Sequence, residues 1–289
     1  MLGIGWSKDN LQLGRDWQTA SLQAIFAGLS LGPVGLADRL DDFPRPPTAG
    51  SKVRTNVTLA MALVAKNGML LQPSVPLQPV AELLLELPPL GRHAGQIWTT
   101  HTAVHAAGTT AVPAVWFTVL GFANGKINAT DWPLAATTFG PGVDFAAPQS
   151  NFSTVPKGSF GGTGYVLSGS YVWAPSSAVV AQGASWKSSP LGAESLVSLT
   201  TGTPDLAYVA PVLGGIVLFG ENSKLAAVST YRFETVTATP SGGVSVALRG
   251  APGEVVELIY SVGGASGGPI LRQNATVGPD GTTTVVITG

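Results

Sequence analysis

The stretch over residues 22–43 most constrains what this chain can fold into. The apolar residues of its first half share the i, i+3, i+4 spacing of an amphipathic helix: Leu22, Ile25, Phe26 and Leu29. This spacing predicts a helix over residues 16–29. Residues 31–37 follow as a short apolar run with a proline between two glycines, which indicates a buried strand ending at Asp38 and Arg39. A helix, a tight turn and a buried strand form one βα step of a barrel, in which functional residues lie at the carboxyl ends of the strands.

Three segments follow one another in a recognisable order. They are residues 2–9 (LGIGWSKD), residues 32–38 (GPVGLAD) and residues 67–77 (NGMLLQPSVPL). In this order they resemble the last strands of the alpha-galactosidase, raffinose synthase and alpha-glucosidase superfamily of glycoside hydrolases. The similarity is greatest to a poorly characterised eukaryotic branch with ALG…PSKD and GGPVGPSD strands and a DGxLLxPSxPL segment. It covers the first third of the chain well and the rest loosely.

The resemblance implies an α/β plus all-β chain, with the last two βα units of a (β/α)8-type barrel followed by an antiparallel β-sandwich region. In that superfamily the nucleophile sits on barrel strand four and the acid/base on strand six. This chain starts at the equivalent of strand seven, so no catalytic residue is assigned in it. Asp9 and Asp38, at the ends of strands seven and eight, are the candidate substrate-binding residues. The alternative is that both are loop carboxylates that cap helices.

After Gly91 the sequence changes to short strand-forming runs separated by turn residues, and this change predicts two domains. Residues 1–90 are expected to be the C-terminal part of a TIM-barrel-like domain, with a second helix over 55–66. Residues 91–289 are expected to form a β-sandwich domain, or two that meet near 183–192, because short Val-, Thr- and aromatic-rich runs alternate with turn residues. The predicted strands cover residues 97–104, 112–122, 164–173, 176–182, 195–200, 206–210, 215–219, 225–229, 233–239, 244–249, 255–262 and 282–288.

Charged side chains are scarce. Asp, Glu, Lys and Arg make up 11% of the 289 residues, and the net charge is -1. No cluster of Lys and Arg occurs, which argues against nucleic acid as a partner because neutralising phosphates requires one. No run approaches the roughly 20 apolar residues that a membrane-spanning helix needs. The chain has no cysteine, so disulfides, thiol catalysis and cysteine metal sites are ruled out.

Four Asn-x-Ser/Thr sequons predict N-glycosylation, at Asn56, Asn128, Asn151 and Asn274. Asn128 and Asn274 are expected in polar loops between strands. Four sequons in one chain favour a secreted or cell-surface protein, against the alternative that so loose a pattern arises by chance. The N-terminus lacks a basic region followed by an apolar core, so the signal peptide is expected to lie outside this chain.

Other motifs carry weaker signals. His101 and His105 are four residues apart, but the zinc-protease pattern requires Glu where Thr102 stands, so neither a metal site nor a cofactor is predicted. The glycine-rich run at 161–164 lacks the P-loop lysine and predicts only a loop. Three tryptophans lie in predicted strands, which favours the core over sugar stacking: Trp98, Trp116 and Trp173.

These observations favour a non-catalytic C-terminal portion of a glycosidase-like extracellular glycoprotein, with a structural or recognition role in a larger assembly. Two helices and two short strands cannot close a barrel, so a further polypeptide is predicted to complete it by pairing with both edges of residues 32–35. Carbohydrate is a candidate ligand. Two alternatives stay open: part of an active glycoside hydrolase whose catalytic strands lie on another segment, and a carbohydrate-binding β module. Whether the chain is an enzyme is therefore undecided at this point.

Overall fold

The computed structural model describes residues 6–11, 17–36, 57–79, 95–105, 113–123, 130–133, 164–170, 187–190, 196–199, 205–262 and 269–289. Within these ranges the chain forms two helices, α1 (Trp17–Leu29) and α2 (Val57–Met61). The strands are β1 (Trp6–Leu11), β2 (Leu31–Leu36), β3 (Gln78–Pro79), β4 (Gly95–Val104), β5 (Ala114–Ala123), β6 (Thr130–Pro133), β7 (Gly164–Ser170), β8 (Lys187–Pro190), β9 (Leu196–Leu199), β10 (Asp205–Leu213), β11 (Ile216–Glu221), β12 (Phe233–Ala238), β13 (Val244–Arg249), β14 (Val255–Val262), β15 (Leu271–Thr276) and β16 (Thr282–Ile287).

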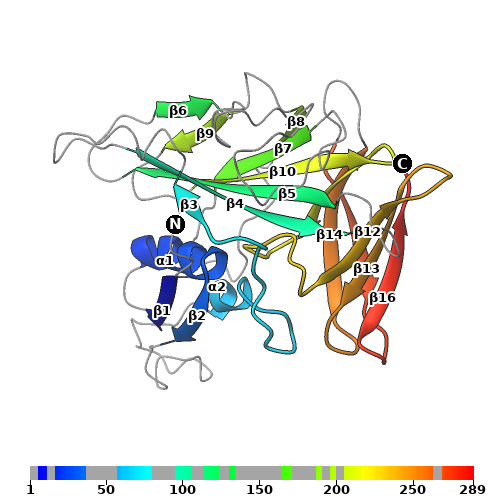
Figure 1. The fold of residues 1–289 in the computed structure, drawn as a ribbon, viewed down its shortest axis with the longest axis horizontal. Coiled ribbons are helices and arrows are strands. Elements are labelled where there is room, and N and C mark those ends of the chain that lie inside the picture. The colour runs from blue at the N-terminus through cyan, green and yellow to red at the C-terminus, as the bar shows by residue number, and fades with distance from the viewer. Residues whose placement is uncertain are drawn as a thin grey trace, which may run out of the picture.

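A nine-stranded, mostly antiparallel sheet dominates the fold (Figure 1). Its main path runs in the order β15-β14-β11-β10-β5-β4-β3, and β7 and β8 extend it from β10. β4 and β5 pair in register along their whole lengths, from Gly95 opposite Ala123 to Val104 opposite Ala114. β10 joins the two halves of the sheet, because it pairs with β5, β7 and β11. A separate antiparallel pair, β6 and β9, lies at the top of Figure 1.

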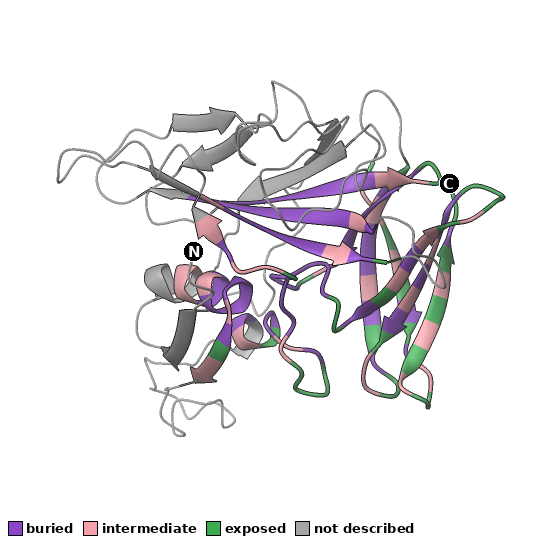
Figure 2. Ribbon diagram, viewed as in Figure 1, coloured by how far each residue is buried: buried purple, intermediate pink, exposed green. Residues whose placement is uncertain are grey.

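A three-stranded sheet, in the order β12-β13-β16, packs against the β11-β14-β15 end of the large sheet. Burial alternates along β13, as expected for a strand with one face in the core and one in solvent, whereas in β12 a register shift separates the buried Phe233 and Val236 by three residues (Figure 2). The buried face of these strands includes Val236, Val244, Val246 and Leu248. Together the two sheets form a sandwich-like layer at the right of the figure, and this part of the sequence-based expectation is confirmed.

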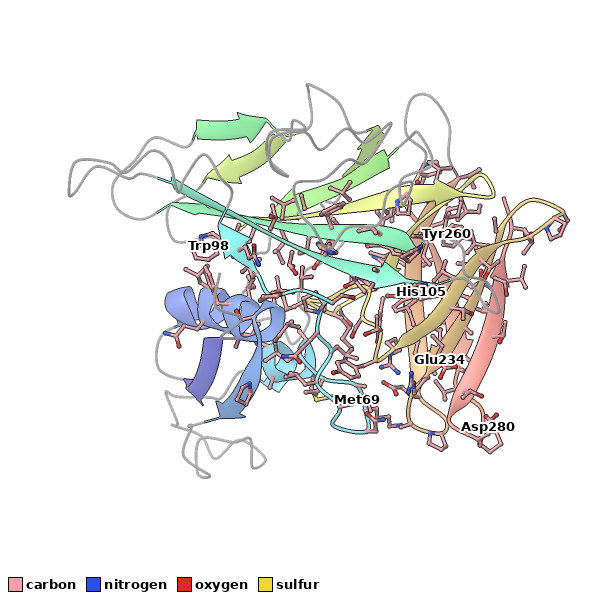
Figure 3. All side chains as sticks on the ribbon, viewed as in Figure 1. Met69, Trp98, His105, Glu234, Tyr260 and Asp280 are labelled. Carbon is pink, nitrogen blue, oxygen red and sulfur yellow. The ribbon has the colours of Figure 1, made fainter. Side chains whose placement is uncertain are left out.

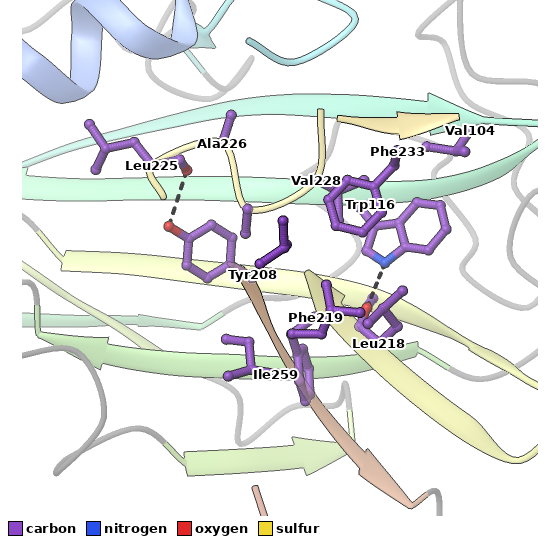
Figure 4. Packing of buried hydrophobic residues seen from close by; sticks show 14 of the residues in the cluster. Val104, Trp116, Tyr208, Leu218, Phe219, Leu225, Ala226, Val228, Phe233 and Ile259 are labelled. Atoms are coloured by element: carbon purple, nitrogen blue, oxygen red, sulfur yellow. Dashed lines mark hydrogen bonds between the residues drawn. The ribbon is translucent and has the colours of Figure 1, made fainter. Parts of the chain in front are cut away.

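The segment between β11 and β12 crosses the core without forming a strand. Gly220 makes the crossing possible, because its φ is +119° and an added Cβ would lie 2.3 Å from the carbonyl oxygen of Ala227. Two buried side chains fix the path of the neighbouring backbone (Figure 4). The Tyr208 hydroxyl donates to the Leu225 carbonyl at 3.1 Å, and the Trp116 ring nitrogen donates to the Leu218 carbonyl at 2.7 Å.

The N-terminal helices pack on this same core. α1 forms where the apolar spacing predicts it and buries Ile25 and Leu29 completely. Gly28 of α1 is so close to its neighbours that an added Cβ would lie 2.5 Å from Leu63 and 3.8 Å from Leu225. Ile25, Leu29 and Leu59 of the two helices are therefore buried by this chain's own residues, whereas Met61 at the end of α2 is exposed.

Residues 71–79 run from α2 to β3 and tie the helices to β4. The backbone N–H groups of Ser74 and Val75 donate to the His101 carbonyl at 2.9 and 3.3 Å, and the N–H of Leu77 donates to the Leu29 carbonyl at 2.8 Å. The Gln72 side chain donates to the Gly32 carbonyl at 3.1 Å. One extended segment thus links α1, β2 and the large sheet.

The prediction of the last two βα units of a (β/α)8-type barrel is wrong. The described structure is mostly antiparallel, it contains two helices, and its one parallel ladder is the isolated pair β1 and β2 around α1. The predicted helix over 55–66 ends at Met61, since the chain turns back at Gly68 (φ +82°) and Val64 bridges Leu70. Among the described residues β2 pairs with β1 alone, so the predicted pairing on both edges of residues 32–35 is not seen there.

Most other predicted strands in the described ranges are confirmed, with one exception. Residues 225–229 do not form a strand: they are the buried crossing segment. Three strands were not predicted: β15, whose sequence LRQNAT is polar, and the four-residue strands β6 and β8. The predicted strand at 176–182 and most of the predicted seam at 183–192 lie outside the described residues.

Candidate functional site

Three charged side chains meet inside the sandwich-like layer, and we call Glu221, Arg232 and Glu254 the ionic cluster. Glu221 ends β11, Arg232 directly precedes β12, and Glu254 directly precedes β14. Their side chains are almost fully buried, with exposed fractions of 6% for Glu221, 0% for Arg232 and 7% for Glu254. In a chain with so few charges, this burial makes the cluster the strongest candidate for a functional site in the described residues.

Arg232 uses its whole guanidinium within the cluster. Nε donates to Glu221 Oε2 at 2.9 Å, and Nη2 lies 3.5 Å from Glu221 Oε1. On the other side, Nη1 donates to Glu254 Oε2 at 3.0 Å and Nη2 to Glu254 Oε1 at 2.6 Å. Nη1 also donates to the Arg249 carbonyl at 2.8 Å. A guanidinium has five N–H donors, and here they meet five acceptors.

Backbone groups complete the set of partners of Glu254. The N–H of Lys66 donates to Oε1 at 2.9 Å, and the N–H of Ala251 donates to Oε2 at 2.9 Å. Lys66 belongs to the turn that follows α2, so the ionic cluster reaches from β14 to the N-terminal helices. Both oxygens of Glu254 are thereby taken up by hydrogen bonds.

Lys224 makes a second contact with the same turn. Its Nζ donates to the Met61 carbonyl at 2.7 Å and to the Val64 carbonyl at 2.6 Å. These are carbonyls at the end of α2, which a helix leaves without partners inside the helix. The adjacent N–H of Leu225 donates to the Ala62 carbonyl at 3.0 Å. Lys224 therefore caps α2 from the crossing segment.

Burial and charge act in opposite directions on the two carboxyl groups. Burial raises the pKa of Glu221, against the opposing charges of Arg232 and Lys224. Burial alone would also raise the pKa of Glu254, but hydrogen bonds from Arg232, Lys66 and Ala251 lower that pKa to about 2. Burial likewise lowers the pKa of the Lys224 ammonium, against the charge of Glu221.

Two carboxyl groups whose pKa values are driven apart are the pattern of a general acid and a general base. A retaining glycosidase holds such a pair about 5 Å apart with the scissile bond between them. In this protein the Arg232 guanidinium occupies the space between Glu221 and Glu254 and binds both. No oxygen of Glu254 is left to approach a substrate, so the arrangement is suited to holding segments together rather than to proton transfer.

The residues predicted from the sequence are not brought together in the described part of the chain. Asp9 lies on β1, but its side chain is outside the described residues, as is all of Asp38. Three of the sequon asparagines are also outside them: Asn56, Asn128 and Asn151. Asn274 is exposed, but it lies within β15 and not in a loop, so that part of the prediction is wrong.

His101 and two of the three strand tryptophans, Trp98 and Trp116, pack against aromatic residues or in the core, and Trp173 lies outside the described residues. His101 is buried beside Phe117, with ring centroids 5.5 Å apart, and burial lowers its pKa to about 4. His105 is exposed just beyond β4 (Figure 3). Trp98 meets Phe26 edge-on at 5.0 Å, and Trp116 is buried. Across the described ranges, no group of three or more His, Asp or Glu residues is placed to hold a metal ion.

Sequence reasoning missed the ionic cluster because its members follow no motif and lie 11 and 22 residues apart. One signal was present. Glu221 ends the apolar run IVLFG, and Arg232 stands between two aromatic residues, so both charges lie in sequence that predicts a core. Charged residues in such positions are buried only when they are paired.

No helix in the described part of the chain is long and apolar enough to cross a membrane. Comparison with known proteins gives no match either to a family model or to a curated protein.

Proposed function

We propose that this chain is a non-catalytic structural module of a glycosidase-like, secreted or cell-surface glycoprotein. The observation that carries the proposal is the ionic cluster, in which Arg232 saturates a pair of buried carboxylates that would otherwise be the natural candidates for hydrolysis. The segments LGIGWSKD, GPVGLAD and NGMLLQPSVPL support the glycosidase-like character, and the four sequons support a secretory route.

The role of the module is to hold the turn after α2 and the extended residues 71–79 against the sheets. Lys66, Lys224 and Gln72 all take part in bonds between the N-terminal helices and the rest of the chain. Carbohydrate recognition through aromatic stacking is less well supported, because Trp98 and Trp116 are engaged in the interior. The remaining alternative, an active hydrolase, requires catalytic groups on another segment.

The test is turnover of aryl α-galactosides and aryl α-glucosides by the purified chain. We expect none above the buffer rate, because Arg232 binds both buried carboxylates, Glu221 and Glu254. Turnover by the purified chain that is lost in Asp38→Asn, and is absent from a heat-inactivated sample, would show that the chain is an enzyme and would overturn the proposal.

A further inference from the structure

The outer face of β14 and β15 carries an unusual group of exposed residues. In the β14–β15 ladder, Val255 is opposite Thr276 and Glu257 is opposite Asn274. Directly opposed residues of an antiparallel pair point to the same face, and their Cβ atoms lie about 5 Å apart. Asn274 is therefore the direct neighbour of Glu257 and the diagonal neighbour of Val255.

Glu257 is held in place beside Asn274. The Asn222 side-chain amide donates to Glu257 Oε2, and Arg272 Nη1 lies 3.5 Å from Oε1. Arg272 is two residues before Asn274 on β15, so it lies on the same outer face. A carboxylate and a guanidinium thus border Asn274 on two sides.

Val255 is the most exposed large apolar side chain in the described residues, at 57%. Its cross-strand neighbour is Thr276, and the next residue of β14 on the same face is Glu257. The Asn274 amide, for its part, is exposed, and within the described part of the chain no hydrogen bond or ion pair engages it. An accessible side-chain amide beside an uncovered valine and a surface ion pair is suited to a covalently attached, amphipathic group.

We propose that Asn274 carries an N-linked glycan whose first N-acetylhexosamine lies over Val255 and beside the Glu257–Arg272 pair. The apolar face of the sugar ring would cover the valine, and its hydroxyl and acetamido groups would face the charged pair. The sequon Asn274-Ala275-Thr276 supplies the acceptor, and Thr276 is exposed on the same face. The proposal rests on the secretory route of the proposed function, because the modification occurs there.

The chemistry requires a lipid-linked pyrophosphate oligosaccharide as donor. The Nδ2 atom of Asn274 forms a bond to the anomeric carbon of the first sugar. The bond from that carbon to the phosphate oxygen breaks, and the lipid pyrophosphate leaves with the electron pair. Nδ2 gives up one proton, so no oxidant or reductant is needed.

The experiment uses the full chain secreted from a eukaryotic host with an added signal peptide, and the same chain made in bacteria. The bacterial form is practical because the chain has no cysteine. Occupancy of Asn274 is measured by peptide mass spectrometry. Thr276→Val removes this sequon alone. The change in Tm that this substitution causes is measured in the secreted form and in the bacterial form. The difference between the two changes is the effect of the Asn274 glycan on Tm.

We expect Asn274 to be occupied and the glycan to raise Tm by about 2 °C, the shift that a modest packing contribution gives in a domain of this size. Val255→Ser should abolish that rise. Val262→Ser is the matched control, since Val262 is an exposed valine at the other end of β14, and it should leave the rise unchanged.

A bare Asn274 in the secreted protein, or a glycan-dependent rise that is the same in Val255→Ser and in Val262→Ser, would overturn the proposal. Failure of the proposed function looks different. If the recombinant secreted chain carries the glycan while protein from the native source is bare, the site stands and the secretory assignment of the proposed function fails.

Discussion

Arg232 and Glu254 face each other as a two-pronged ion pair, with Nη1–Oε2 and Nη2–Oε1 distances of 3.0 and 2.6 Å. Parallel bonds of this kind fix both the distance and the orientation of the partners. Because Glu254 also accepts the N–H of Lys66, the pair connects the sandwich-like layer to the turn after α2.

Arg232→Met should lower the free energy of unfolding by about 3–5 kcal/mol, because it leaves two buried carboxylates without their cation. The measurement is urea unfolding at neutral pH. Arg249→Met is the control: Arg249 pairs with Glu234 at 3.2 Å, but both side chains are exposed, at 46% and 36%. Such surface pairs contribute about 0–1 kcal/mol. Equal losses in the two variants would contradict the structural role of Arg232.

Lys224→Met should loosen the turn after α2 while the sheets stay folded, since it removes the donor to the Met61 and Val64 carbonyls. Limited proteolysis should then cut within residues 61–70 faster than in the wild type. Lys66→Met is the matched control, because the Lys66 side chain is exposed and only its backbone N–H binds Glu254. Cleavage at the wild-type rate in Lys224→Met would show that the cap is dispensable.

Glu254 should give the stability a dependence on pH at the acid end. Its pKa of about 2 in the fold lies below the ordinary value of 4.5. A group whose pKa is lowered by folding contributes stability that is full above the unfolded pKa and is lost as the pH falls to the folded pKa. We therefore expect urea midpoints to fall between about pH 4.5 and pH 2.

The variant Glu254→Gln should flatten that acid slope, whereas Glu234→Gln, at an exposed carboxylate on β12, should retain it. Burial raises the pKa of Glu221, so its own contribution has the opposite sign and remains in both variants. An unchanged acid slope in Glu254→Gln would mean that the low pKa is not the source of the dependence.

His101 should give the stability a second dependence on pH, in a higher pH range than that of Glu254. Burial lowers its pKa from 6.5 to about 4, so the fold holds the neutral ring. Stability is then complete above pH 6.5 and is lost as the pH falls toward 4, by up to about 3 kcal/mol at 1.36 kcal/mol per pKa unit. His101→Gln should remove this slope, and His105→Gln, at an exposed position, should not. The check is thermal unfolding between pH 7 and pH 4.5.

Several elements could be predicted from the sequence because their patterns are local. The spacing of Leu22, Ile25 and Leu29 predicted α1, and Val- and Thr-rich runs between turn residues predicted β12 and β13. The same local patterns misled for residues 225–229. That run is apolar like a strand, but it is buried because the chain crosses the core there, which depends on Gly220 and on distant neighbours.

The barrel interpretation failed for a related reason. A helix followed by a buried strand is compatible with a barrel, and nothing local in residues 31–37 shows that β2 joins a two-stranded sheet. What covers α1 is residues far along the chain, such as Leu225. The sequence also could not predict that the ionic cluster forms, since Glu221, Arg232 and Glu254 become neighbours only when the two sheets pack.

Hydrogen exchange at the Lys66 amide is the most direct test of whether the ionic cluster holds the N-terminal helices to the sheets. Val246, which lies in the middle strand of the three-stranded sheet, provides the reference amide. In the wild type and in Arg249→Met, we expect Lys66 to exchange at a rate similar to that of Val246, through global unfolding. In Arg232→Met, Lys66 should exchange at least about tenfold faster than Val246, because the turn after α2 can open by itself. An unchanged ratio of the two rates in Arg232→Met would contradict the structural role assigned to the cluster.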